Sequence, residues 1–369
     1  MDKCLHILPM STLSGAEKMT LSLCKNLKEY EPIVICGGNP LKEVFEENEI
    51  TTYSTSFDYK NIISNMKFIC SVIKQHNIKI IHAHDNNASI IVYMVKRIYG
   101  LEVNIISHIH SCYPWIKNKK SINKKIDGFF RPRYNHNILC GKIVQNFYKQ
   151  NTDYFKEETA SILSNAVDIS ELCITSYSEF KDLRIKYNIP ENKIVLGFIG
   201  RICHIKGIIP FIKEFSKNVD KFKDTVVLLV GSGDQFEEVK ELIKVLNLEE
   251  YFILTGFQKD IYKFYPLIDI LFLPSLYEGL PMVILEAMAS RTPVISMDVG
   301  GISEVIVDNY SGFLVEEKNY AQFISKIIEL KNDVTLRSKF SSNAFEIISN
   351  NFNIQKYCEN VEKIYKNFI

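Results

Sequence analysis

The sequence of 369 residues contains no long hydrophobic run, because no stretch approaches the roughly 18 consecutive apolar residues that a membrane-spanning helix requires. It also lacks a charge of one sign, since 44 Lys and Arg residues against 43 Asp and Glu residues leave a formal net charge of +1. A dedicated nucleic-acid binder normally has a clear basic excess, so that class is disfavoured. The nine cysteines form no Cys-x-x-Cys pair, and Pro9 interrupts the only apolar run near the start. We therefore expect a cytoplasmic protein with reduced thiols and no secretory signal.

Common nucleotide-binding signatures are missing as well. The sequence has neither the GxxxxGK[ST] pattern of a P-loop nor the GxGxxG pattern of a dinucleotide-binding turn. None of its fifteen aspartates forms an Asp-x-Asp pair that could hold a metal-bound diphosphate. These absences disfavour P-loop enzymes and dinucleotide-dependent oxidoreductases.

Short β-branched runs alternate with longer helical patterns along the whole chain. In the first half the candidate strands are Cys4–Leu8, Ile33–Cys36, Ile80–Ala83, Val103–Ser107 and Ile138–Leu139. In the second half they are Ile194–Ile199, Val226–Val230, Phe252–Leu254, Ile270–Leu273 and Val294–Ser296. Continuously apolar strands separated by helices predict parallel sheets covered on both faces, so we expect an α/β protein with two Rossmann-like domains.

The domain boundaries are predicted from changes in composition. We expect a first domain over residues 1–170, a polar linker over 171–192 and a second domain over 193–350. Residues 351–369 are expected to form a C-terminal helix that returns to the first domain. A ligand should bind in the cleft that faces the carboxyl ends of both sheets.

The most informative segment is Glu278-Gly-Leu-Pro-Met-Val-Ile-Leu-Glu286, which follows a candidate strand and enters a helix near Pro281. The helix is apolar except for Glu286, so this carboxylate is expected to be buried with a strong partner. Glu278 and Glu286 would lie about 10–12 Å apart along the axis, which suits a long hydroxyl-rich ligand. Alternatively, Glu278 caps the helix and Glu286 pairs with a buried Lys or Arg.

A second segment, Gly200-Arg-Ile-Cys-His-Ile-Lys-Gly207, places a cationic loop directly after a candidate strand. Arg201 and Lys206 could converge on a diphosphate, Arg as a planar fork and Lys as a point charge. Two ordinary surface cations are the alternative interpretation.

These two segments resemble the E-x7-E and G-R-(x)n-K-G motifs of retaining glycosyltransferases of family 4. Residues 164–168 (SNAVD) partly match the PNG[VI]D motif of that family, with Ser164 in place of proline and Ala166 in place of glycine. Further matches lie at 230–233 (VGSG), 255–257 (TGF), 292–295 (TPVI) and 300–304 (GGISE), so the ordered set spans most of the chain. The resemblance implies the GT-B fold, in which two Rossmann-like domains face a central cleft.

The resemblance also implies roles in a metal-independent reaction without a cofactor. Glu286 would bind the ribose of the nucleotide, and Glu278 would hold the transferred sugar. Arg201 and Lys206 would neutralise the leaving diphosphate. The remaining donor-binding positions of the second domain would be Gly200, Gly256, Phe257, Gln258, Gly279 and Leu280.

In the first domain, residues 9–17 (PMSTLSGAE) resemble the glycine-rich loop of the family, in which Gly15 allows close approach to the donor or acceptor. A simple turn capped by Ser14 is the alternative.

Seven of the eight histidines lie within residues 1–136, and His82/His84 and His108/His110 have His-x-His spacing. A metal site is one interpretation. We prefer the resemblance of residues 107–111 to the H-x-H-[SN] motif, in which the second histidine touches the donor sugar. This assigns the role to His110, with His108 as the alternative, and we expect no metal.

Residues 115–133 (WIKNKKSINKKIDGFFRPR) contain seven Lys or Arg and one Asp, a formal balance of +6. Apolar residues recur at helical spacing, and the only tryptophan of the chain begins the segment. This pattern is typical of an amphipathic helix at a membrane surface, although it also fits a solvated helix whose apolar side packs inward. The predicted membrane contacts are Trp115, Lys119, Lys120, Lys124 and Lys125.

We therefore expect a retaining, metal-independent hexosyltransferase that uses a nucleotide-diphospho-sugar, with a UDP-hexose preferred. Its acceptor would be a lipid-linked oligosaccharide at the inner face of the cytoplasmic membrane, in surface polysaccharide biosynthesis such as capsule or exopolysaccharide. The alternatives are an enzyme similar to UDP-N-acetylglucosamine 2-epimerase and a non-catalytic protein that binds sugar nucleotides.

Overall fold

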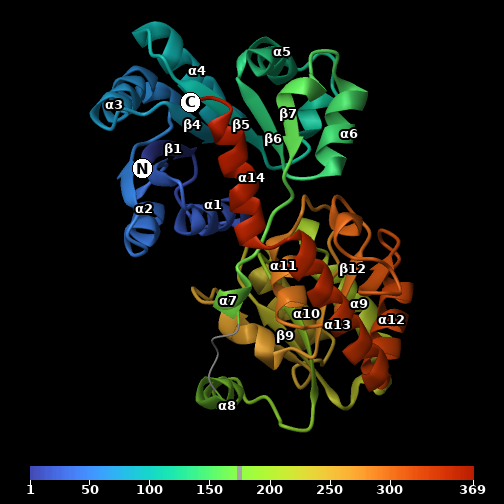
Figure 1. The fold of residues 1–369 in the computed structure, drawn as a ribbon. Helices are drawn as coiled ribbons and strands as arrows, with labels where there is room; N and C mark the ends of the chain where they lie inside the picture. The colour runs from blue at the N-terminus through green and yellow to red at the C-terminus, as the bar shows by residue number, and fades with distance from the viewer. Residues whose placement is uncertain (173–176) are drawn as a thin grey trace. The chain divides into compact units, whose positions relative to one another are not determined.

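The computed structural model describes residues 1–172 and 177–369, which divide into two compact units, each with its own parallel sheet (Figure 1). Unit 1 comprises Met1–Ala166 and Ile354–Ile369, and unit 2 comprises Val167–Asn353. The α/β class and the parallel sheets of the prediction are confirmed.

Unit 1 contains a sheet of seven parallel strands in the order β3-β2-β1-β4-β5-β6-β7. The strands are β1 (Asp2–Leu8), β2 (Tyr30–Cys36), β3 (Thr51–Ser54), β4 (Ile80–His84), β5 (Asn104–Ile109), β6 (His136–Leu139) and β7 (Ala160–Ile162). The helices are α1 (Gly15–Asn26), α2 (Asn39–Glu46), α3 (Ile62–Gln75), α4 (Asp85–Tyr99), α5 (Ile122–Phe130), α6 (Lys142–Asn151) and α14 (Ile354–Lys366). Short 3-10 turns lie at Tyr59–Asn61, Pro114–Ile116, Arg131–Arg133 and Glu157–Thr159.

Unit 2 contains a sheet of six parallel strands in the order β10-β9-β8-β11-β12-β13. The strands are β8 (Ile194–Ile199), β9 (Thr225–Val230), β10 (Phe252–Gly256), β11 (Ile270–Leu273), β12 (Val294–Met297) and β13 (Gly312–Val315). The helices are α7 (Ile169–Leu172), α8 (Tyr177–Lys186), α9 (Ile208–Ser216), α10 (Phe236–Val245), α11 (Met282–Ala289), α12 (Tyr320–Asn332) and α13 (Val334–Asn351). Short 3-10 turns lie at His204–Lys206, Val219–Phe222, Tyr262–Leu267 and Ile302–Glu304.

In both sheets the first strand lies inside the sheet, and the chain adds strands first on one side of it and then on the other. This reversal occurs between β1 and β4 in unit 1 and between β8 and β11 in unit 2. Open parallel sheets bind ligands beyond the carboxyl ends of the strands at such a point. We call these places the switch point of unit 1 and the switch point of unit 2.

The inner strands and the edge strand β10 were predicted, and the three other edge strands were not. No candidate strand covers β3, β7 or β13. β3 and β7 have the sequences TTYS and ASI, which lack the continuous apolar pattern of an inner strand. An edge strand pairs on one side only, so it needs less apolar surface.

The expected linker, residues 171–192, contains the end of α7 and helix α8 within the part that the structure describes. Phe180 and Leu183 of α8 pack against the hydrophobic core of unit 2. At the other end of the chain, α14 belongs to unit 1 and packs against α1. The Glu362 carboxylate accepts hydrogen bonds from the backbone N–H groups of Lys28 and Glu29 at 2.7 and 2.8 Å, which ties α14 to the end of α1.

Candidate active site

An ion pair lies at the switch point of unit 2. Lys206 belongs to the 3-10 turn that follows β8, and Glu278 belongs to the loop between β11 and α11. Lys206 Nζ donates a hydrogen bond to Glu278 Oε1 at 2.6 Å, and Ser275 Oγ donates to the same oxygen at 2.6 Å. The Lys206 and Glu278 side chains are 18% and 9% exposed, so the pair is largely shielded from water. Two predicted site residues that lie 72 positions apart in sequence are thus in direct contact.

Two glycines lie in or beside the loops that hold this pair, at positions where a neighbouring backbone leaves no room for a side chain. Gly207 has φ +67° at the start of α9, and a Cβ atom there would lie 2.0 Å from the Pro274 carbonyl oxygen. Gly300 has φ +62°, and a Cβ atom there would lie 1.9 Å from the Glu278 carbonyl oxygen. Glycine is needed at both positions because of the left-handed backbone and the close contact. The backbone around Glu278 is therefore held from two sides.

The other predicted positions of these loops surround the ion pair along the chain. Arg201 is exposed one residue beyond Gly200, whose N–H donates to the Val230 carbonyl at 2.9 Å. The Gly279 carbonyl accepts a hydrogen bond of 2.8 Å from the Gly301 N–H, and the Leu280 side chain is buried. Arg201 is thus the predicted cation of this loop with the freest access to solvent.

Glu286 is buried inside α11, as expected, and one of its partners is a tyrosine. The Tyr265 hydroxyl donates a hydrogen bond to Glu286 Oε2 at 2.5 Å. Burial, followed by the Glu286 carboxylate, raises the pKa of Tyr265 well above its usual value, so this hydroxyl keeps its proton and remains a donor. Glu278 does not cap α11, because Pro281 occupies the cap position.

Several acidic groups gather around the neighbouring Tyr262. Burial raises the pKa of its hydroxyl, and the carboxylates of Glu286, Glu171 and Asp168 raise it further. Asp168 belongs to the partly matched SNAVD motif. Carboxylates in such a setting accept hydrogen bonds from hydroxyl groups, so this part of unit 2 suits a polyhydroxylated ligand better than an anion.

The predicted donor-binding positions Gly256, Phe257 and Gln258 lie at and just beyond the end of β10. Gly256 has φ +69°, and the next side chain, Phe257, is 79% exposed. The Gln258 side-chain amide donates to the Thr255 carbonyl at 2.9 Å. An exposed aromatic ring at a strand end offers a surface on which a planar base could stack.

In unit 1, Ser14 occupies the N-cap position of α1 and Gly15 is the first helical residue. The Ser14 N–H donates to the Glu17 carboxylate at 3.2 Å, which is one half of a capping box. This local geometry matches the alternative interpretation of a capped turn. It leaves Gly15 exposed at the helix N-terminus.

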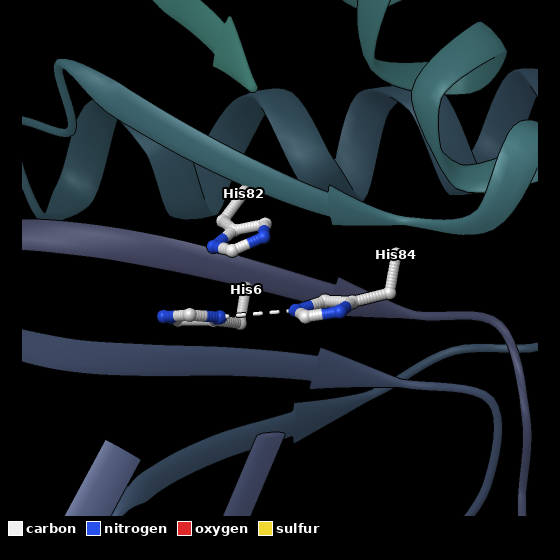
Figure 2. A group of neighbouring side chains, drawn as sticks. All are labelled: His6, His82 and His84. Carbon is white, nitrogen blue, oxygen red and sulfur yellow. Dashed lines mark hydrogen bonds between the residues drawn. The ribbon is translucent and has the colours of Figure 1, made fainter. Parts of the chain in front are cut away.

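Five histidines form a cluster at the switch point of unit 1. His6 pairs in register with His82, and His84 pairs in register with His108, so all of these side chains project from one face of the sheet together with His110. Figure 2 shows the rings of His6, His82 and His84, with the hydrogen bond of 3.1 Å between His6 Nδ1 and His84 Nε2.

The cluster continues on both sides of these three rings. His84 Nδ1 lies 3.0 Å from His110 Nε2, and His82 Nε2 lies 3.2 Å from His108 Nδ1. Burial lowers the pKa of all five rings, and it lowers the pKa of His6 to about 3. The imidazoles are therefore neutral near pH 7.

The basic segment 115–133 forms α5 and its flanking turns. The side chains of Ile122, Ile126 and Phe129 are exposed, whereas Trp115 is half-buried and its ring stacks on Tyr113 at 5.1 Å. This result contradicts the interpretation in which the whole apolar side of the helix packs inward.

The seven basic residues of that segment are not equivalent. Arg131 is buried and forms an ion pair of 2.7 Å with Asp127, so it is structural. Because this pair is neutral, the balance of +6 falls on the six other basic side chains. Lys119, Lys120 and Lys125 are exposed, and Lys124 Nζ donates to the Asn151 carbonyl at 2.6 Å.

The hydroxyl groups that contact the two glutamates were not predicted from the sequence. Ser275 lies three residues before Glu278, so its hydrogen bond is a local signal that the sequence offered. Tyr265 lies 21 residues before Glu286 on a different element, and no sequence pattern links the two residues. His6 was also missed, because its place in the cluster depends on the pairing of β1 with β4.

Two family descriptions account for most of the chain. Residues 13–171 match Glycosyltransferase Family 4, and residues 179–347 match Glycosyl transferases group 1. Together with the two sheets, these matches show that the chain belongs to the glycosyltransferases of family 4 with the GT-B fold. It is a glycosyltransferase.

Relatives and solved structures agree with this assignment over nearly the full length. The chain is 24% identical to the UDP-Gal:alpha-D-GlcNAc-diphosphoundecaprenol alpha-1,3-galactosyltransferase of Escherichia coli, covering 98% of this chain and 96% of that protein. It is 26% identical to the N-acetyl-alpha-D-glucosaminyl L-malate synthase of Bacillus anthracis, covering 96% and 94%. The crystal structure of Anabaena HepE in complex with UDP-glucose superposes with a TM-score of 0.86 at 20% identity, covering 100% of both chains.

Proposed function

We propose that this glycosyltransferase is a retaining, metal-independent hexosyltransferase that moves a hexose from a UDP-sugar to a hydroxyl group of a lipid-linked oligosaccharide. The observation that carries the proposal is the contact between Lys206 and Glu278 at the switch point of unit 2. It joins a cation suited to a diphosphate and a carboxylate suited to sugar hydroxyls in one shielded place.

Each side chain has a task that its chemistry supports. Lys206 and Arg201 stabilise the negative charge that develops on the leaving diphosphate. Glu278 accepts hydrogen bonds from hydroxyl groups of the hexose. Glu286, oriented by Tyr265, accepts hydrogen bonds from the ribose hydroxyls.

The proposed transfer keeps the configuration of the sugar. The acceptor oxygen attacks the anomeric carbon from the face that the diphosphate leaves, so one carbon–oxygen bond forms as the other breaks. The acceptor proton passes to an oxygen of the departing phosphate, and no strong protein base is required. When Lys206 moves to contact the phosphate, its ion pair with Glu278 breaks. The Glu278 carboxylate can then accept hydrogen bonds from the sugar.

Similar proteins support the choice of donor and acceptor. The Escherichia coli relative is named for UDP-Gal and a diphosphoundecaprenol acceptor, and HepE was crystallised with UDP-glucose. We therefore propose a UDP-hexose donor and an acceptor on a lipid diphosphate, in the synthesis of a surface polysaccharide.

A donor panel tests the nucleotide and the need for metal. A true donor at 100 times its Kd stabilises the folded protein by about 2.7 kcal/mol, so a UDP-hexose should raise the Tm more than GDP- or ADP-sugars do. Transfer to a lipid-linked acceptor should continue in excess chelator. A GDP- or ADP-sugar that gives the larger shift would contradict the UDP donor, and conversion of the UDP-sugar to its epimer without acceptor would favour the epimerase-like alternative.

We further propose that the enzyme works at the inner face of the cytoplasmic membrane, held there by α5. In the described residues, no helix is both long and apolar enough to cross a bilayer. Exposed Ile122, Ile126 and Phe129 provide an apolar surface on α5, and the six basic side chains of the segment surround it along the chain. Each basic residue near an anionic surface contributes about 1 kcal/mol, which permits reversible attachment.

Flotation with liposomes that contain anionic lipid tests this attachment. The variant Lys119/Lys120/Lys124/Lys125→Glu should remain with the free protein, whereas wild type should float. The matched control, Lys217/Lys221/Lys223/Lys318→Glu, makes the same charge change at exposed positions of unit 2 and should float like wild type. Equal flotation of both variants would contradict a role for α5.

A further inference from the structure

The histidine cluster of unit 1 has a chemistry that the proposed transfer does not use. Two groups of three histidines, His6/His82/His84 and His84/His108/His110, each offer one ring nitrogen within 4.8 Å of the other two. Only the second group includes a ring that is not fully buried, His110, which gives an ion a route from solvent. The second group is therefore the better candidate for binding.

We propose that His84, His108 and His110 form a binding site for one divalent transition-metal ion of the zinc class. Neutral imidazole is a preferred ligand of zinc, cobalt, nickel and copper, and three imidazoles leave a fourth position for water. The site goes beyond the proposed function, because the transfer needs no metal at the diphosphate.

In each of the two buried rings one nitrogen contacts a histidine outside the group, and the other nitrogen is the candidate ligand atom. His108 uses Nδ1 to bond His82 at 3.2 Å, and its Nε2 is buried without a hydrogen-bond partner among the described residues. An orphaned buried nitrogen is costly unless a ligand satisfies it. His84 bonds His6 through Nε2 at 3.1 Å, and its Nδ1 lies 3.0 Å from His110 Nε2 and 3.3 Å from the Thr20 hydroxyl.

These outer contacts match the surroundings of metal-bound histidines. A ligating imidazole usually donates its other ring N–H to a second group that fixes its orientation, as His6 and His82 are placed to do here. His82 is itself held by the Tyr365 hydroxyl of α14, at 2.7 Å from Nδ1. The ligands are thus braced by a second layer of side chains.

Distances and charges around His110 also fit an ion. His84 Nδ1 and His110 Nε2 lie 3.0 Å apart, and two nitrogens that bind one tetrahedral zinc at ~2.05 Å are about 3.3 Å apart. A small rotation of either ring therefore converts this contact into two metal bonds. The carboxylates of Asp85 and Glu17 act electrostatically on His110, and they would partly offset the charge of the ion.

Titration of the full chain with Co²⁺ and Zn²⁺ tests the site without measuring activity. The protein is first freed of affinity-tag histidines and treated with chelator. One Co²⁺ per chain should give the visible bands of four-coordinate cobalt, and Zn²⁺ should displace it. Mg²⁺ should not bind, because it prefers oxygen ligands.

Variants decide whether the named rings hold the ion. His110→Gln should weaken Co²⁺ binding by ~100-fold or more, and His6→Gln, which removes an outer contact, should weaken it by about 10-fold. His136→Gln and His204→Gln, outside the cluster, should bind like wild type. Circular dichroism shows whether each variant folds. His110 is only half-buried, so we expect His110→Gln to fold. It therefore tests the site even if a substitution at the buried His108 prevents folding.

No cobalt spectrum, or an unchanged affinity in folded His110→Gln, would overturn the proposal. One consequence rests on the proposed function: if His110 touches the donor sugar, Zn²⁺ should raise the apparent KM for the donor. Cobalt binding without any transfer activity would leave the site standing and refute the proposed function instead. Transfer activity without cobalt binding would refute only the site.

Discussion

The switch points of the two units have the same topology and opposite chemistry. In unit 1 the ends of β1, β4 and β5 present neutral imidazoles, whereas in unit 2 the ends of β8 and β11 lead into an ion pair with a buried carboxylate nearby. Neutral rings offer lone pairs, and the ion pair offers full charges to a charged, hydroxyl-rich ligand. The topology of the sheet thus determines where a site can lie, and the side chains at the strand ends determine which ligand binds there.

The largest effect is expected at the switch point of unit 2. Lys206→Ala should lower kcat by about 100- to 1,000-fold with a smaller change in KM, because it removes a charge that acts on the leaving diphosphate. Steady-state kinetics with the preferred donor measures this. The control Lys217→Ala removes an exposed cation of unit 2 and should leave both constants unchanged. Wild-type turnover in Lys206→Ala would refute its role.

A smaller effect is expected at the buried carboxylate. Glu286→Gln keeps the shape of the side chain but removes its charge, and a hydrogen bond to a charged group contributes about 1.5–3 kcal/mol. Donor affinity should therefore fall by roughly 10- to 100-fold. Calorimetric titration with UDP alone measures it, because the proposed contact is to the ribose. Equal UDP affinity in the variant and wild type would contradict that contact.

Acidification should destabilise unit 1 more than unit 2. Burial lowers the pKa of the clustered histidines from 6.5, so the unfolded state binds more protons than the folded state below that pH. Stability is therefore complete above pH 6.5 and falls as the pH decreases toward the folded value, which is about 3 for His6. For His6 the loss is on the order of 2 kcal/mol at pH 5.

Hydrogen exchange at pH 7 and pH 5, in chelator, measures this separation. Unit 1 should lose protection first, because unit 2 contains only one histidine, the exposed His204. Fluorescence of Trp115, the only tryptophan, gives a second signal from unit 1. His6→Gln should reduce the difference between the two pH values, and His204→Gln should not. Equal losses in both units would contradict the assignment.

The smallest effect is expected for the partner of Glu286. Tyr265→Phe removes the hydroxyl that donates to the buried carboxylate, and the free energy of unfolding should fall by about 1–2 kcal/mol. Urea unfolding of unit 2, followed by hydrogen exchange, measures the change. Tyr310→Phe, at an exposed tyrosine of the same unit, should have no effect. An unchanged stability in Tyr265→Phe would show that the hydrogen bond contributes little.

The sequence predicts the inner strands and the loops that follow them, because continuous apolar runs and glycine-containing turns are local patterns. It does not predict the edge strand β3, whose sequence TTYS has no such run. The contact between Lys206 and Glu278 joins two loops in neighbouring regions of the sheet, and no local spacing encodes it.

The histidines show the same limit. The His-x-His spacing predicts that His82 lies beside His84, and His108 beside His110, although His110 comes just after the end of β5. Only the registers of β1 with β4 and of β4 with β5 bring the pairs together and add His6. The register between strands depends on tertiary structure. The sequence alone therefore predicts two separate His-x-His pairs and not one cluster.

We propose that the switch point of unit 2 transfers a hexose with retention. The most direct measurement is the anomeric configuration of the product, determined by NMR after reaction of an α-linked UDP-hexose with a lipid-linked acceptor in excess chelator. We expect an α-linked product from wild type and almost none from Lys206→Ala. A β-linked product, or no transfer from any UDP-hexose, would contradict it.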